Sequence, residues 1–173
     1  ECRASRGVLE RWSVFCERPS LSVVVPVFRG SASLLDEIGT LEAVLRACEP
    51  SYEVLVVIDG DAEAVEAARA IESERVAVLA SGVNRGKGVT VAAGMLHARG
   101  DLVGFMDAGG DIDPEVWPRL IALQRAHNAD AAVASKRHVD STVAYPSLRR
   151  VYSAAFQALT LVLFRLGVPD SQT

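Results

Sequence analysis

Five short apolar runs alternate with helical patterns along the 173-residue sequence, and this alternation constrains the fold more than any other feature. The runs are rich in Val, Leu, Ile and Ala and carry few charges inside them, which is typical of parallel strands covered on both faces. They occupy residues 21–27, 52–59, 75–80, 101–107 and 129–136.

The segments between these runs have the periodicity and composition of helices. In the first of them, Leu34, Ile38 and Leu45 recur at helical intervals. In another, Asp113 is placed as an N-cap and Pro114 as the first helical residue. The predicted helices cover residues 33–48, 61–73, 88–98, 114–127 and 147–167. Regular strand–helix alternation predicts an α/β fold, with a mostly parallel, Rossmann-like sheet, right-handed crossovers and helices on both faces.

Length and charge limit the possible classes of protein. We expect residues 1–19 to form an N-terminal arm or helix and residues 20–173 to form one domain, truncated at its C-terminus, because the sequence stops at "GVPDSQT" without a closing element. A formal net charge of −4 argues against a general nucleic-acid binder. The longest apolar run falls short of the roughly 18–20 residues that span a bilayer.

Charged residues and glycines collect where the apolar runs end. The five runs lead into "PVFRGS", "IDGD", "SGVNRGKG", "DAGGDID" and "SKRH". Because ligands bind at the carboxyl ends of the strands in such sheets, this pattern predicts a site for a charged ligand. The first of these turns has no G-x-G-x-x-G motif, which argues against a dinucleotide-binding oxidoreductase.

These motifs, in this order, resemble the family 2 glycosyltransferases, most closely the dolichyl- and polyprenyl-phosphate sugar synthases. The resemblance covers residues 20–173 and is carried by "VVVPVFRG", "YEVLVVIDGD", "NRGKG", "ARGDLVGFMDA", "ASKR", "RRVYS" and "DSQT". It implies a GT-A fold and inverting transfer of a sugar from a nucleotide-sugar, GDP-mannose or UDP-glucose, to a polyprenyl phosphate. It also implies a cytoplasmic protein that is peripheral to the cytoplasmic membrane. A membrane domain or a partner subunit is compatible with the resemblance.

The resemblance assigns four residues to the nucleotide. Asp59 takes the position of a base-reading carboxylate, Pro26 and Phe28 flank the base, and Lys87 contacts phosphate or base. Three of them have a simpler alternative. Asp59 suits a turn, Phe28 suits a core, and Lys87 suits a solvated loop.

Asp107, at the end of the fourth run, raises the question of a metal ion. Hard oxygen ligands suit Mg²⁺ or Mn²⁺, which stabilises a departing diphosphate as a Lewis acid. The family has Asp-x-Asp here, but Gly109 replaces its second carboxylate. Three alternatives follow: Asp107 binds metal with waters and diphosphate, Asp111 joins it, or metal binding is weak and the protein is slow or inactive. Asp113 is interpreted as a helix cap.

The acceptor side is basic. Residues 136–165 hold five Lys and Arg against one acid. A phosphate monoester is already anionic, so it needs positive partners more than a general base. Arginine offers bidentate geometry, which assigns the acceptor phosphate to Arg137, Arg149 and Arg150. A solvated basic face is the alternative. The implied catalytic residues are Asp107, Arg137, Arg149 and Asp170.

Two other functions remain open. The first is a transferase of the same fold that acts on a polysaccharide or a small molecule. The second is a catalytically decayed nucleotide-binding module, because Gly30, Ile58 and Gly109 stand where the family has acids.

Overall fold

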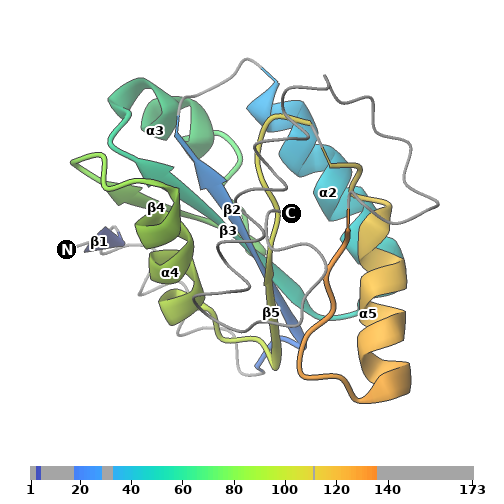
Figure 1. Ribbon diagram of the computed structural model, residues 1–173. Coiled ribbons are helices and arrows are strands. Elements are labelled where there is room, and N and C mark those ends of the chain that lie inside the picture. The colour runs from blue at the N-terminus through green and yellow to red at the C-terminus, as the bar shows by residue number, and fades with distance from the viewer. Residues whose placement is uncertain (1–2, 5–17, 29–32, 111, 136–173) are drawn as a thin grey trace, which may run out of the picture. The chain divides into compact units, whose positions relative to one another are not determined.

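The structure is a computed structural model that describes residues 3–4, 18–28, 33–110 and 112–135 (Figure 1). The chain divides into two compact units, Glu1–Pro118 and Arg119–Thr173. The predicted helix 147–167 lies outside the described residues. So do five predicted site residues: Asp111, Arg137, Arg149, Arg150 and Asp170.

One sheet forms the centre of the first unit. Its strands are β1 (Arg3–Ala4), β2 (Leu21–Val27), β3 (Tyr52–Asp59), β4 (Val76–Ser81) and β5 (Leu102–Phe105). They follow the order β1-β4-β3-β2-β5. Strands β2 to β5 run parallel, and β1 pairs antiparallel with β4. The prediction of a mostly parallel sheet is confirmed, and the bounds of β2 and β3 agree with the sequence prediction.

The helices also follow the predicted order. They are α2 (Leu34–Cys48), α3 (Ala62–Arg69), α4 (Lys87–His97) and α5 (Val116–His127). Helix α3 ends earlier than the expected 61–73, and α5 begins at Val116 because Asp113 and Pro114 form the turn before it.

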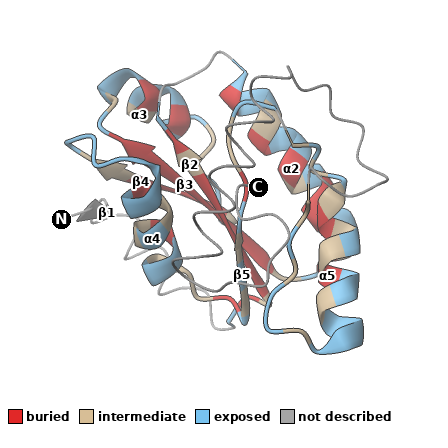
Figure 2. Cartoon of the chain, in the orientation of Figure 1, coloured by how far each residue is buried: buried red, intermediate tan, exposed pale blue. Residues whose placement is uncertain are grey.

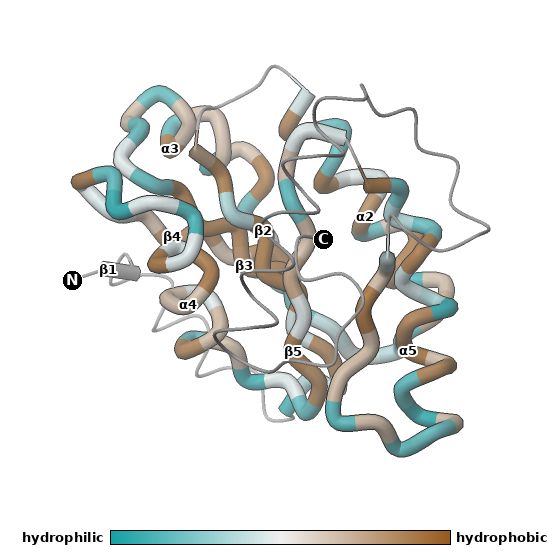
Figure 3. Tube along the Cα trace, in the orientation of Figure 1, coloured by the Kyte–Doolittle hydropathy of each residue, from teal (hydrophilic) through white to brown (hydrophobic). Residues whose placement is uncertain are grey.

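The core lies on both faces of the sheet, with β3 buried along its whole length (Figure 2). The apolar colouring of β2 and β3 in Figure 3 marks the same region. On one face, Gly94 of α4 packs against the side chains of Val24 and Val57. Helices α2 and α3 contact each other and β3. With right-handed crossovers, the reversal of direction before β5 puts α4 on the face opposite α2 and α3.

The strand order creates a switch point between β2 and β5. From β2 the chain proceeds outward through β3 to β4, and then returns to place β5 on the other side of β2. The helix that follows β2 and the helix that precedes β5 therefore lie on opposite faces of the sheet. In open α/β sheets, such a point opens a crevice for a ligand.

The predicted strand at 129–136 is wrong for the described part of that segment. Residues 129–135 are irregular, and none of them pairs with another described strand. The reason is composition: the stretch is mostly Ala, which is depleted in strands, and Val133 is its one β-branched residue. An apolar run without β-branched side chains is weak evidence for a strand.

We predict that Gly94→Ala destabilises the first unit by about 1–3 kcal/mol, because the new methyl group overpacks a filled interface. A Cβ at this position would lie 2.9 Å from Val57 Cγ2, and closer still to Val24. Gly88→Ala in the same helix is the control, because a Cβ there meets nothing within 4 Å. Urea unfolding of both variants measures the difference. Equal stability of the two would contradict the packing described here.

Candidate donor-binding site

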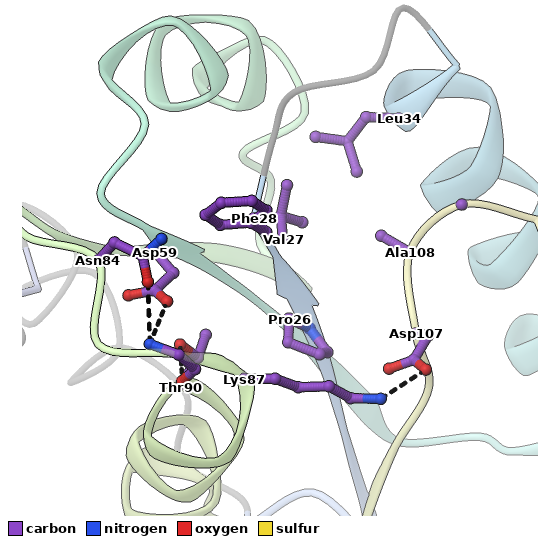
Figure 4. Close-up of a pocket in the computed structure, with 12 residues that line it drawn as sticks. Pro26, Val27, Phe28, Leu34, Asp59, Asn84, Lys87, Thr90, Asp107 and Ala108 are labelled. Atoms are coloured by element: carbon purple, nitrogen blue, oxygen red, sulfur yellow. Dashed lines mark hydrogen bonds and ion pairs between the residues drawn. The ribbon is translucent and has the colours of Figure 1, made fainter. Parts of the chain in front are cut away.

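A cavity of about 530 Å³ lies at the carboxyl ends of β2 and β5, at the switch point (Figure 4). Its volume is in the range of small-molecule sites. All five sequence-predicted site residues that the structure describes line it: Pro26, Phe28, Asp59, Lys87 and Asp107. Residues 81 positions apart in the sequence therefore meet at one place. Their assigned roles remain predictions, whereas their proximity is an observation.

The carboxylate of Asp59 anchors one wall of this cavity. It is only 3% exposed, and its Oδ1 and Oδ2 accept the backbone N–H groups of Arg85 and Gly86, each at 2.7 Å. Asn84 Oδ1 also accepts the Gly86 N–H, at 3.0 Å. Gly60, with φ of +78°, has no side chain to collide with the backbone of Asn84. Asp59 therefore does more than end a strand, because it holds the loop that leads into α4.

This anchored loop fixes the start of α4. Gly86 precedes the helix with φ of +86°, and its carbonyl accepts the hydroxyl of Thr90 at 3.0 Å. Gly86, Lys87 and Thr90 all line the cavity. The N-terminus of an α-helix carries unpaired amides and a partial positive charge, which favour an anion. The arrangement gives one side of the cavity an attraction for phosphate.

Lys87 extends from the start of α4 toward Asp107 (Figure 4). Its Nζ lies 2.7 Å from Asp107 Oδ2, and 5.9 Å from the centroid of the Phe105 ring. The side chains are 56% and 31% exposed for Lys87 and Asp107 respectively. Lys87 is thus an ion-pair partner across the cavity, which neither the phosphate assignment nor the solvated-loop alternative included.

A second clamp holds the loop after Asp107. The backbone N–H of Gly109 donates to Glu37 Oε2 at 2.8 Å, and the Ser33 hydroxyl donates to Glu37 Oε1 at 2.7 Å. Gly109 and Gly110 have φ of +118° and +72°, values that favour glycine. Sequence reasoning missed Glu37, because an acid in the first turn of a helix is common and its partner is 72 residues away.

The structure also places Phe28, Ile58 and Asp113, which the sequence analysis had singled out. Phe28 is 54% exposed at the cavity, so it is not a core aromatic. Ile58 is completely buried and does not line the cavity. Asp113 Oδ1 accepts the N–H of Glu115 at 3.0 Å, so Asp113 caps the turn that precedes α5 and is not adjacent to the first helical residue, Val116.

The described residues offer a divalent cation one carboxylate rather than a cage. Among them, no three or more His, Cys, Asp or Glu side chains are grouped to hold a metal ion. Both oxygens of Asp59 already accept backbone amides, which leaves Asp107 as the acid available in the cavity. Mg²⁺ commonly takes one or two carboxylates and completes its shell with water and substrate phosphates. The donor set fits a metal that binds together with a diphosphate.

The chain is similar to known proteins along most of its length. The family model described as "Glycosyl transferase family 2" matches residues 22–167. An undecaprenyl-phosphate 4-deoxy-4-formamido-L-arabinose transferase of Pseudomonas fluorescens (strain Pf0-1) is 31% identical over 133 residues, which are 73% of this chain and 39% of the relative. The protein of the same name from Klebsiella pneumoniae subsp. pneumoniae is 36% identical over 107 residues, covering 59% of this chain and 32% of the relative.

A solved structure shows the same fold. The crystal structure of S. aureus TarS 1-349 superposes with a TM-score of 0.50 at 23% identity, covering 74% of this chain and 39% of that one. The likeness supports an α/β fold of the GT-A type. The chain spans about two fifths of the length of the first of these relatives and of this structure.

We predict that Asp59→Asn loosens residues 84–86, because an amide offers one acceptor oxygen in place of two and turns its NH₂ toward a backbone N–H. The expected loss is about 1–3 kcal/mol, with faster hydrogen exchange at the amides of Arg85 and Gly86. Asp61→Asn is the matched control, because Asp61 caps α3 and Asn caps equally well. Unchanged exchange in the Asp59 variant would contradict the anchoring role.

We also predict that Glu37→Ala frees the amide of Gly109. Its hydrogen exchange accelerates by roughly tenfold, because the charge-assisted hydrogen bond that protects this exposed amide is lost. The neighbouring Asp36→Ala serves as control for helix propensity and charge. If both variants exchange alike at Gly109, the contact does not hold the loop.

Proposed function

Because the chain belongs to glycosyl transferase family 2, we propose that it takes part in transfer of a sugar from a nucleotide-sugar donor to a polyprenyl phosphate. The observation that carries the donor half is the cavity at the switch point, which brings Lys87, Asp107 and the start of α4 together. The acceptor half is supported by the relatives, which are named undecaprenyl-phosphate transferases. GDP-mannose and UDP-glucose are the proposed donors.

Different regions of the cavity suit the base and the diphosphate of a nucleotide-sugar. Exposed Phe28 and the adjoining Pro26 offer an apolar surface to a base at one end. The diphosphate faces the N-terminus of α4 and the ammonium of Lys87. A base N–H pointing toward Asp59 would meet a carboxylate whose two oxygens each already accept one amide and retain a further lone pair. Base reading by Asp59 is therefore proposed as a second role beside the loop anchor.

The proposed cofactor is Mg²⁺ or Mn²⁺ held by Asp107. When bound, such an ion stabilises the negative charge of a departing diphosphate as a Lewis acid. Asp111 remains the proposed additional ligand. In the described part of the site, Asp107 orients one carboxylate into the cavity, and Glu37 keeps the loop after it in place through Gly109.

The proposed chemistry needs no general base. A phosphate oxygen of the acceptor attacks the anomeric carbon, the bond from that carbon to the donor diphosphate breaks, and the nucleoside diphosphate leaves with both electrons. A donor with an α-linkage gives a β-linked product. Arg137, Arg149 and Arg150 are proposed to hold the acceptor phosphate, with Asp170 near the sugar.

A location at the cytoplasmic face of a membrane is proposed from the lipid acceptor alone. Across the part of the chain that the structure describes, none of the helices has the length and apolar character to span a bilayer.

We predict that the protein, mixed with undecaprenyl phosphate in vesicles, Mn²⁺ and radiolabelled GDP-mannose or UDP-glucose, forms a labelled lipid. Asp107→Asn should lower the rate by about 10²–10³-fold, because the site loses its available carboxylate. Asp113→Asn is the control, because Asn preserves the cap and the wild-type rate. Label found in a sugar or polysaccharide without lipid phosphate would point to the other transferase. Tight nucleotide binding with no product from any donor would point to a decayed module.

A further inference from the structure

The carboxylate of Asp107 has two possible partners, the Lys87 ammonium and a divalent cation. Asp107 is the residue available to hold a divalent cation, yet its Oδ2 is 2.7 Å from the Lys87 ammonium. Two cations cannot share that oxygen at contact distance without strong mutual repulsion. A metal ion on Oδ2 therefore has to displace Lys87, and one on Oδ1 would lie close enough to the ammonium to be repelled by it.

At Asp107, the charges of the carboxylate and of the Lys87 ammonium balance in this state. The described lining of the cavity contains two acids, Asp59 and Asp107, and one basic side chain, Lys87. Asp59 is buried and bound to backbone amides, whereas Asp107 is neutralised by Lys87. Gly109, which replaces the second acid of the family motif, adds no charge. Asp36, Glu37 and Asp113 line an adjoining pocket together with Asp107, so the competition concerns the Asp107 carboxylate itself rather than the overall potential.

The ion pair between Lys87 and Asp107 is weak enough to be broken by a competing anion. More than half of the Lys87 side chain is exposed, and exposed pairs are weak because water and salt screen them. A diphosphate carries more negative charge than one carboxylate, so it competes well for an ammonium. Lys87 is the first residue of α4, and its flexible side chain lines the same cavity as the helix N-terminus.

We propose that Lys87 is a built-in competitor of the divalent cation at Asp107, displaced by the donor diphosphate. In the resting protein, the Lys87 ammonium holds the Asp107 carboxylate. When the diphosphate enters, the ammonium transfers its contact to a phosphate oxygen, and the carboxylate becomes available as a ligand. This inference rests on the proposed function, since it assumes that the cavity takes a nucleoside diphosphate.

The test is a pair of binding measurements on Lys87→Met. Mn²⁺ alone, followed by the electron paramagnetic resonance signal of free Mn²⁺, should bind the variant roughly tenfold more tightly, because a repelling charge about 5 Å away is removed. UDP and GDP, titrated by calorimetry in EDTA, should bind the variant at least fivefold more weakly. Opposite changes for two ligands distinguish competition from a folding defect, which would weaken both.

Two further variants keep the inference falsifiable. Arg85→Gln removes a charge from the same loop at an exposed position and should leave Mn²⁺ affinity near the wild-type value. In an Asp107→Asn background, Lys87→Met should no longer raise Mn²⁺ affinity, because the contested carboxylate is absent. Unchanged or weaker Mn²⁺ binding by the single Lys87 variant overturns the inference. A gain that persists without Asp107 also overturns it.

The two proposals fail in different ways. If Lys87→Met gains Mn²⁺ affinity but neither UDP nor GDP binds the wild-type protein, competition at Asp107 stands and the proposed function is wrong. The opposite result is that both nucleotides bind, sugar transfer occurs, and Lys87→Met has the same Mn²⁺ affinity as the wild-type protein. In that case the proposed function stands and competition at Asp107 is wrong.

Discussion

The buried carboxylate of Asp59, which accepts two successive backbone amides, is the interaction on which the rest of the site depends. Burying a charge is costly unless hydrogen bonds compensate it, and the amides of Arg85 and Gly86 provide two short ones. These residues immediately precede α4, so the carboxylate at the tip of β3 determines where that helix begins. It thereby determines where Lys87 enters the cavity. A displaced loop would move both the helix N-terminus and the one basic side chain of the described lining.

The two walls of the cavity are held by the same kind of contact from different elements. Glu37, on α2, accepts the Gly109 amide, as Asp59, on β3, accepts those of the loop before α4. The body of α4 is fixed separately, where Gly94 allows close approach to the side chains of β2 and β3. Each wall thus combines a glycine with a carboxylate that binds main-chain amides: a side chain at Gly60 would collide with backbone, and Gly109 has a positive φ that favours glycine. Irregular backbone at a strand end needs such partners to keep one conformation.

The sequence predicted the sheet well where Val, Leu and Ile formed continuous runs, as in β2 and β3. It failed at 129–135, where Ala supplied apolar character without the branched side chains that favour strands. It also predicted that Asp59, Lys87 and Asp107 would gather, because parallel strands end at one edge. It did not predict their pairing, because contacts such as Gly109 with Glu37 depend on loop geometry that local patterns do not encode.

The loss of an acid at position 109 is easier to understand once Lys87 is considered with it. With two carboxylates, one ammonium would leave a net negative charge, and a dication would be attracted whether or not a donor was present. With Gly109, one ammonium is paired with one carboxylate, and a diphosphate that draws the ammonium away makes that carboxylate available to a dication. A single-carboxylate site is then not simply a weakened double one. Its affinity for metal is linked to its affinity for donor, and such linkage is reciprocal by thermodynamic necessity.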